Sequence, residues 1–251
     1  MQLKAKLGTA VAALLLIAAV AITVARSPSG RGTDGPLVVS GGVPPTPPAA
    51  GATPAAGPAP TDPWGRAGRY RAWATRMSTL VPVAPRVLAA YALGEQSAPT
   101  SCGLSWVTLA AIGSVESAHG SFRGAVVGDD GTSTPAIVGP PLDGSPGVQA
   151  IPDTDDGQYD GDRVWDRAVG PMQFLPGTWR RWGVDADGDG SARPDDLDDA
   201  AATAARYLCA STTTMRTGAG WWAAITAYNR SGEYAQKVLD RSNEYARDSL
   251  G

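Results

Sequence analysis

All eight tryptophans and all seven tyrosines of this 251-residue chain lie after residue 63. Aromatic side chains supply much of the apolar surface that a core buries, so the folded part of the chain must lie within residues 63–251. That length is sufficient to build a complete hydrophobic core. We therefore expect one domain over residues 63–251, preceded by segments that do not contribute to its core.

The first 26 residues have the pattern of a segment that enters a membrane. Lys4 and Lys6 precede an uncharged stretch of 19 apolar or small residues, and Arg26 closes it. A helix of that length spans about 28 Å, close to the thickness of the hydrocarbon core of a bilayer. Residues 1–26 are predicted to be a signal anchor or a cleaved signal peptide, and their length favours the anchor. The lysines place the rest of the chain on the extracytoplasmic side, in the cell envelope.

Residues 27–62 consist largely of Pro, Gly, Ala, Ser and Thr. Such a segment buries too little surface to offset the entropy of ordering it. We expect a disordered linker that holds the domain away from the membrane.

Charge and cysteine content restrict the partners and the compartment. Residues 27–251 carry 18 Lys and Arg against 24 Asp and Glu, which argues against nucleic acid or anionic lipid as the partner of the domain. The only two cysteines, Cys102 and Cys209, are predicted to form a disulfide after export. Two buried free thiols are the alternative. The sequence does not indicate an oligomeric state.

Helical periodicity dominates the domain. Helices are expected over residues 65–80, 87–93, 104–118, 171–182, 197–209, 221–229 and 234–249. A long segment rich in Gly, Pro and Asp separates the third from the fourth, over residues 121–164, with a short strand near 136–138. The predicted fold class is mainly α, with a small β part and an irregular insertion, and insertions of this length usually serve function.

The candidate chemistry rests on a single carboxyl group. One histidine and two cysteines are too few for a zinc site of His and Cys ligands. Among only four glutamates, Glu116 follows Leu109 and Ile112 at helical spacing, at the end of an apolar stripe. Burial there should raise its pKa and keep it protonated as a general acid. The structural alternative is a glutamate at a helix end held by Arg123.

Three ordered motifs bear a resemblance to a known family. They are ESAHG at residues 116–120, AVGPMQFLPGTW at residues 168–179 and AYN at residues 227–229. Together they resemble the signature of lytic murein transglycosylases, which are lysozyme-like enzymes, and most closely the branch of MltB-type and actinobacterial exported members. The resemblance extends over nearly the whole domain.

The resemblance implies a mechanism without a cofactor. Glu116 would protonate the glycosidic oxygen between N-acetylmuramic acid and N-acetylglucosamine of peptidoglycan and then act as base. The substrate's N-acetyl group would stabilise the cation, and the muramyl 6-hydroxyl would attack to give a 1,6-anhydro product. By motif position, the residues expected to bind the glycan are Ser117, Met172, Gln173, Tyr228 and Asn229. His119 is expected to be a structural hydrogen-bonding group.

Two other functions stay open from the sequence. A lysozyme-type muramidase on the same fold would use water as the acceptor, and a noncatalytic peptidoglycan-binding domain would not cut the glycan at all. In each case the partners are peptidoglycan glycan strands, with membrane contact through the N-terminal segment.

Residues 185–196 resemble an EF-hand loop with oxygen ligands at the expected spacing. The expected ligands of a structural Ca²⁺ are Asp185, Asp187, Asp189, Ser191 and Asp196. The loop departs from the usual pattern because Asp196 stands where a longer Glu is typical and because Arg193 offers no carboxylate. An ion-free turn that caps the next helix is the alternative.

A second acidic run, residues 153–162, lacks that register. It is interpreted as a solvated loop, or else as a rim of the glycan groove. Asp166 and Arg167, which follow it, are expected to form a structural pair.

Overall fold

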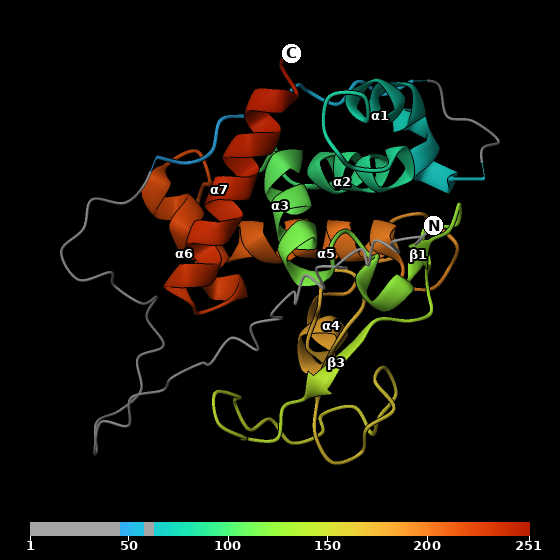
Figure 1. Cartoon of the computed structure of the whole chain (residues 1–251), viewed down its shortest axis with the longest axis vertical. Coiled ribbons are helices and arrows are strands. Elements are labelled where there is room, and N and C mark those ends of the chain that lie inside the picture. Colours follow the sequence, from blue (N-terminus) through green and yellow to red (C-terminus); the bar gives the residue numbers. More distant parts are fainter. Residues whose placement is uncertain (1–45, 58–62) are drawn as a thin grey trace, which may run out of the picture.

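The computed structural model of this protein describes residues 46–57 and 63–251. Within these residues it contains seven α-helices, two 3₁₀ turns and four short strands (Figure 1). They are η1 (Gly65–Tyr70), α1 (Arg71–Met77), α2 (Pro85–Ser97), α3 (Trp106–Ser117), η2 (Phe122–Gly124), β1 (Val126–Val127), β2 (Ser133–Thr134), β3 (Val138–Pro141), β4 (Arg167–Val169), α4 (Pro176–Trp182), α5 (Leu197–Ala210), α6 (Gly218–Tyr228) and α7 (Gly232–Asp248). The prediction of a mainly α fold is confirmed.

Helix α3 lies at the centre of the helical part. Every residue from Trp106 to Gly113 is buried, as expected for a helix surrounded by protein. Helix α7 packs along α3, and α2 packs against α5 (Figure 1). Helix α3 ends where Ala118 and His119 adopt positive φ angles of 49° and 62°, so its last turn, with Glu116, emerges at the border of the core.

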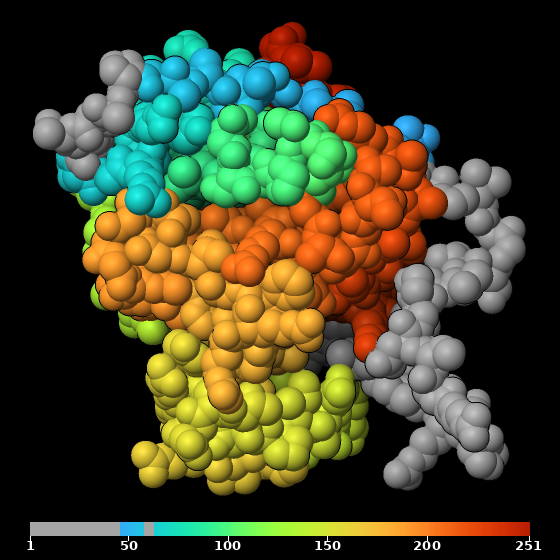
Figure 2. Space-filling model, turned by 180° about the vertical axis from the view of Figure 1, so that it is seen from behind, coloured from blue at the N-terminus to red at the C-terminus, as the bar shows by residue number. Residues whose placement is uncertain are grey.

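The segment between α3 and α4 forms a lobe of its own, which we call the insertion (residues 121–175). Figure 2 shows its yellow part as a lower projection from the body of the molecule. Strand β1 pairs antiparallel with β2, and β3 with β4. The expected strand near 136–138 is therefore found slightly later, at β3. The segment is more ordered than its composition suggested, because these ladders and turns provide hydrogen-bond partners for its backbone N–H and C=O groups.

Two helix predictions need correction. The helix expected over residues 171–182 begins at Pro176, because Val169 and Phe174 exchange backbone hydrogen bonds of 2.8 and 2.9 Å around a tight turn. Gly170 and Gln173 take positive φ angles of 75° and 50° in that turn. The helix expected over residues 65–80 is instead η1 followed by the short α1, and two glycines in η1 are poor helix formers.

A buried arginine, Arg86, joins two helices to each other and to the insertion. Both guanidinium Nη atoms of Arg86 (α2) donate to the carboxylate of Asp198 (α5), at 2.8 and 2.7 Å. The Nε of Arg86 donates to the carbonyl oxygen of Asp129 at the beginning of the insertion, at 2.8 Å. The two side chains are 7% and 0% exposed, so the pair is shielded from water.

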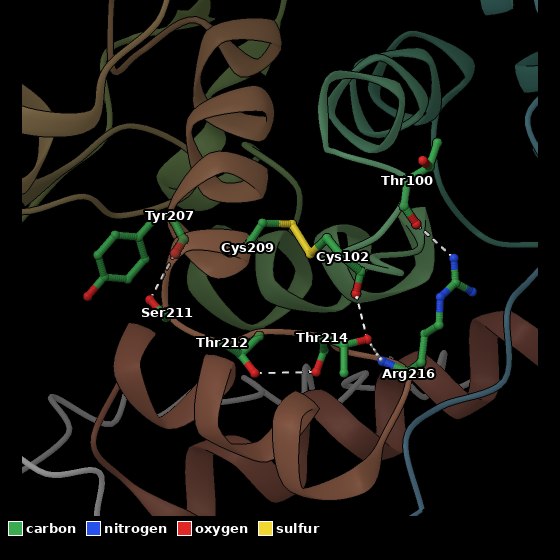
Figure 3. The surroundings of a disulfide bond; sticks show 8 residues. All are labelled: Thr100, Cys102, Tyr207, Cys209, Ser211, Thr212, Thr214 and Arg216. Carbon is green, nitrogen blue, oxygen red and sulfur yellow. Dashed lines mark hydrogen bonds between the residues drawn. A yellow bond between two sulfur atoms is a disulfide. The ribbon is translucent and has the colours of Figure 1, made fainter.

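The predicted disulfide between Cys102 and Cys209 is confirmed. It joins the loop before α3 to the end of α5, with 5.6 Å between the Cα atoms (Figure 3). Thr214 and Arg216 lie beside it, and Thr214 Oγ1 and the backbone N–H of Met215 both donate to the carbonyl oxygen of Cys102. The bridge closes a loop of 107 residues that contains α3 and the whole insertion.

Part of the predicted linker lies against the domain. The indole N–H of Trp106 donates to the carbonyl oxygen of Ala52 at 3.0 Å, and Ala52 N–H donates to Ser249 Oγ at 3.0 Å. The contacts of the domain thus extend N-terminal to residue 63. In the part of the chain that the structure describes, no helix is long and apolar enough to span a bilayer. The segment predicted to enter the membrane, residues 1–26, lies outside the described residues.

Candidate active site

An open cleft lies between the helices and the insertion. We call its two sides the helical wall and the insertion wall. The helical wall, from α3, α5, α6 and α7 and their ends, consists of Ser114, Val115, Glu116, Tyr207, Ala227, Tyr228, Asn229, Arg230, Ser231, Glu233, Tyr234, Lys237, Asp240, Arg241, Asn243, Glu244 and Arg247. The insertion wall, from the insertion and α4, consists of Pro140, Leu142, Val148, Gln149, Ile151, Ala168, Gln173, Leu175 and Thr178. No residue of the insertion wall has an ionisable side chain.

Glu116 lies half-buried in the helical wall, in the last turn of α3. Its Oε1 accepts a hydrogen bond of 2.7 Å from the phenol of Tyr234, at the beginning of α7. Burial raises the pKa of Glu116 from 4.5 to about 7, and the Tyr234 hydrogen bond opposes this rise. Near neutral pH a large fraction of Glu116 is therefore protonated, as a proton donor requires.

Glu116 has no ion-pair partner among the described residues, whose salt bridges involve other carboxylates. Arg123, the partner in the structural alternative, lies instead over the ring of Phe122, at 5.1 Å. A carboxyl group with a raised pKa, a single phenol donor and access to a cleft has the properties of a general acid.

Tyr234 is the contact that the sequence motifs missed. Burial and the nearby Glu116 hold its pKa well above the usual value of a tyrosine, so it stays a hydrogen-bond donor. The sequence feature that could have located Tyr234 is Ser231, the N-cap of α7. The hydroxyl of Ser231 accepts from the backbone N–H of Tyr234 at 3.2 Å. That cap places Tyr234 in the first turn of α7, shortly after the third motif.

The third motif lies in the cleft beside Glu116. The phenol of Tyr228 donates to the carbonyl oxygen of Met172 at 2.7 Å, which ties α6 to the second motif. The Oδ1 of Asn229 accepts from the backbone N–H of Ser231 at 3.1 Å, which leaves its amide N–H₂ for other partners. Tyr228 and Asn229 therefore both line the cleft, and their contact with a glycan stays a prediction.

The second and first motifs contribute fewer lining residues than expected. Gln173 lines the cleft, with its side-chain amide donating to the carbonyl oxygen of Gly170 at 2.9 Å. Met172 is fully buried in the core, and Ser117 is 2% exposed. The hydroxyl of Ser117 donates to the carbonyl oxygen of Pro171 at 2.6 Å. Ser117 and Met172 thus hold two motifs together behind the cleft and do not face it.

His119 is a structural hydrogen-bonding group, as predicted. Its Nδ1 pairs with the hydroxyl of Tyr91 at 3.0 Å, and its Nε2 pairs with that of Tyr245 at 2.8 Å. Burial lowers the pKa of His119 to about 4. The ring is therefore neutral near pH 7 and links α2, α3 and α7.

The other three glutamates have structural or surface contacts. Glu95 accepts from the backbone N–H of Trp106 at 2.6 Å at the beginning of α3. Glu233 and Glu244, on the helical wall, pair with Lys237 and Arg241 at 2.8 and 2.7 Å on an exposed face. Glu116 is the one glutamate of this chain with a raised pKa at the cleft.

The predicted cation loop is only partly assembled as expected. One carboxylate oxygen each from Asp185, Asp187 and Asp199 lie within 4.8 Å of one another, and Asp199 was not among the predicted ligands. Asp196, the predicted twelfth-position ligand, is instead the N-cap of α5, where its Oδ1 accepts from the backbone N–H of Asp198. The Asp196 side chain caps the beginning of α5, and Asp199 in the first turn of that helix supplies the third carboxylate.

Comparison with known proteins supports the motif assignment. Residues 157–222 match the family model described as a transglycosylase SLT domain. This stretch contains the second motif, whereas the first and third motifs lie outside it. The match covers about a quarter of this chain and agrees with the resemblance recognised in its sequence.

A solved structure is also similar to this chain. It is the Escherichia coli lytic transglycosylase Slt35 in complex with bulgecin A, with 15% sequence identity and a TM-score of 0.43. The match covers 77% of this chain and 82% of that one. No curated protein matches the chain in sequence.

Proposed function

We propose that this protein is a lytic transglycosylase that cleaves the glycosidic bond between N-acetylmuramic acid and N-acetylglucosamine in peptidoglycan, with formation of a 1,6-anhydro end. The observation that carries the proposal is Glu116, a half-buried carboxyl group with a raised pKa in a cleft whose opposite wall has no ionisable side chain. The transglycosylase domain match supports the substrate class.

Glu116 begins the reaction as general acid. With its pKa raised to about 7, it holds a proton that it can give to the leaving glycosidic oxygen. The Tyr234 phenol, 2.7 Å from Oε1, then stabilises the carboxylate that forms. The same carboxylate serves as base when the acceptor hydroxyl loses its proton, so one residue carries both proton transfers.

The insertion wall explains why the acceptor would belong to the substrate. Most glycosidases place a second carboxylate across the bond, as nucleophile or to activate water. Here the residues that face the helical wall are apolar side chains, two amides and a threonine. The N-acetyl group of the sugar would stabilise the cation, and the muramyl 6-hydroxyl would attack in place of water.

The location and the calcium loop are further proposals. The disulfide between Cys102 and Cys209 supports an oxidising, extracytoplasmic compartment, in keeping with residues 1–26 as anchor or signal peptide. The chemistry needs no cofactor. Asp185, Asp187 and Asp199 would hold a structural Ca²⁺, since their carboxylates converge at the position expected for the loop.

A matched pair of variants tests the role of Glu116. Glu116→Gln keeps the shape of the side chain and the hydrogen bond to Tyr234 but removes the proton donor. We expect the initial rate at which soluble fragments leave purified sacculi to fall about 10³-fold. Glu233→Gln, on the exposed rim of the same wall, is the control and should stay within about twofold of wild type.

Two results would contradict the proposal. Clearance by Glu116→Gln at the rate of Glu233→Gln would remove Glu116 from the chemistry. A wild-type protein that binds sacculi but releases no fragments would support the noncatalytic binding domain instead.

A further inference from the structure

The insertion contains a second group of carboxylates, distinct from the loop at residues 185–199 and from the cleft. One carboxylate oxygen each from Asp153, Asp155 and Asp166 lie within 4.8 Å of one another. The sequence suggested a solvated acidic loop, but Asp155 is 8% exposed and Asp166 is 1% exposed. Two of these three carboxylates are therefore removed from water, which is costly for charged groups without compensation.

One oxygen of this group has no partner. The Oδ2 of Asp155 accepts from the backbone N–H of Tyr159 at 2.7 Å. Its Oδ1 is buried and makes no hydrogen bond with any described residue. Buried polar atoms are nearly always hydrogen-bonded or bound to an ion, so this oxygen, on a side chain that converges with two other carboxylates, indicates a missing ligand.

No basic side chain of the described residues neutralises the group. Arg167, expected to pair with Asp166, instead binds Asp162, with 2.8 Å between Nη2 and Oδ2. Among the described residues, the Asp166 carboxylate accepts only from Thr154, from its backbone N–H at 2.8 Å and from its hydroxyl at 2.9 and 3.1 Å. The nearby arginine is thus occupied, and the three carboxylates converge without a protein cation.

We propose that Asp153, Asp155 and Asp166 bind a Ca²⁺ ion in the insertion. Ligand oxygens around Ca²⁺ lie about 2.4 Å from the ion and hence up to about 4.8 Å from one another, and the three carboxylate oxygens lie within that limit. All the available donors are oxygens, and a ligand set of carboxylates on an irregular loop suits Ca²⁺ better than the strict octahedron of Mg²⁺.

The ion would fix the insertion wall of the cleft. The backbone N–H of Asp166 donates to the carbonyl oxygen of Ile151 at 2.9 Å. The carbonyl oxygen of Asp166 accepts from the backbone N–H of Leu142 at 3.0 Å. Both partners line the cleft. Because Asp153 lies two residues after Ile151, a shared ion would tie the two ends of the loop over residues 153–166 to this wall.

Calorimetry on full-length purified protein in detergent tests the site, with Ca²⁺ as the titrant. In an Asp185→Asn/Asp187→Asn background, which removes the other acidic group, we expect one Ca²⁺ per chain to remain. Adding Asp155→Asn should abolish that binding. Adding Asp156→Asn should preserve it, since Asp156 is an exposed neighbour outside the group.

A thermal readout separates loss of binding from loss of folding. Ca²⁺ should raise the Tm of the background protein and of Asp156→Asn, because a ligand of the native state stabilises it, and should leave Asp155→Asn unchanged. If Asp155→Asn fails to unfold cooperatively, Asp153→Asn replaces it. The proposal is overturned if the background binds no Ca²⁺, if it binds only Mg²⁺, or if the folded Asp155 or Asp153 variant binds like its parent. None of these readouts depends on glycan cleavage.

Discussion

The cleft has a helical wall with many ionisable side chains, among them Glu116 and Tyr234, and an insertion wall with none. The helical wall is held by a continuous core and a disulfide, whereas the insertion wall is held by short ladders and turns, and the insertion is joined to the helices by a hydrogen bond from buried Arg86 to the Asp129 carbonyl. A proton donor must keep a fixed position and a shifted pKa, and the core provides both. The insertion wall has only to shape the groove, so it is free to be irregular.

Loss of the disulfide should have the largest effect on the helical side. Cys102→Ser/Cys209→Ser releases a loop of 107 residues and should lower the free energy of unfolding by about 4 kcal/mol. Neither cysteine lines the cleft, so the fraction that stays folded should keep its activity. Urea denaturation of oxidised wild type and variant measures the difference. Equal midpoints would show that the bridge contributes nothing.

Breaking the buried ion pair between α2 and α5 should cost slightly less. Asp198→Asn leaves the buried Arg86 charge with only the Asp129 carbonyl, and should lower the free energy of unfolding by about 3 kcal/mol. The exposed pair of Glu233 with Lys237 is the control, because Glu233→Gln should change stability by less than about 0.5 kcal/mol. If both variants lose the same amount, burial does not distinguish the two pairs.

Glu116 should destabilise the fold as pH rises. Its pKa of about 7 in the folded protein exceeds the ordinary 4.5 of an unfolded chain, so the neutral carboxyl favours folding fully below pH 4.5. This contribution is lost as pH rises towards 7. The full shift corresponds to about 3 kcal/mol, and because the carboxyl reaches the cleft we expect about 2 kcal/mol. Relative to wild type, the free energy of unfolding of Glu116→Gln should therefore increase by about 2 kcal/mol between pH 4.5 and pH 8.

Stability curves of both proteins against pH check this expectation. Parallel curves would contradict the raised pKa, even if Glu116 were needed for activity. A difference in the free energy of unfolding that increases with pH would show that ionised Glu116 destabilises the folded protein.

Tyr234→Phe should have the smallest effect, on the pH profile of the reaction. The Tyr234 phenol stabilises the charged form of Glu116 and so lowers its pKa. Without it, the pKa should rise above 7 by about one unit, because a hydrogen bond to a charged group is worth on the order of 1.5 kcal/mol. The alkaline limb of kcat/KM should move to higher pH.

Tyr207→Phe is the matched control for this profile. Its phenol also belongs to the helical wall but donates to the carbonyl oxygen of Ala227, at 3.0 Å. The alkaline limb of this variant should stay in place. A limb that moves to lower pH in Tyr234→Phe would mean that the phenol does not stabilise the Glu116 carboxylate.

The sequence predicted the helical side well. Helices α3, α5 and α7 begin and end within about two residues of their expected bounds, because apolar periodicity marks them. The position of Glu116 at the end of a buried helix followed from the same periodicity. The disulfide followed from there being only two cysteines in a chain predicted to be exported.

Apart from the disulfide, the long-range contacts were not accessible to the sequence. Tyr234 reaches Glu116 across 118 residues, and no local pattern encodes that approach. Ser117 and Met172 do not line the cleft, because the Ser117 hydroxyl binds the Pro171 carbonyl and Met172 is buried in the core, although motif position alone suggested glycan contact. In the insertion, charged composition indicated a solvated loop, whereas turns of the backbone bring Asp155 and Asp166 together in a buried group.

The chemistry of the cleaved end tests the central claim most directly, namely that Glu116 is the sole acid and base and that the insertion wall opposite it has no carboxylate. Purified sacculi are digested with wild-type protein, and the released muropeptides are weighed by mass spectrometry before and after borohydride reduction. We predict 1,6-anhydromuramic acid ends, which borohydride does not reduce. Muropeptides that end in reducible N-acetylmuramic acid would show that water is the acceptor, and would contradict the account.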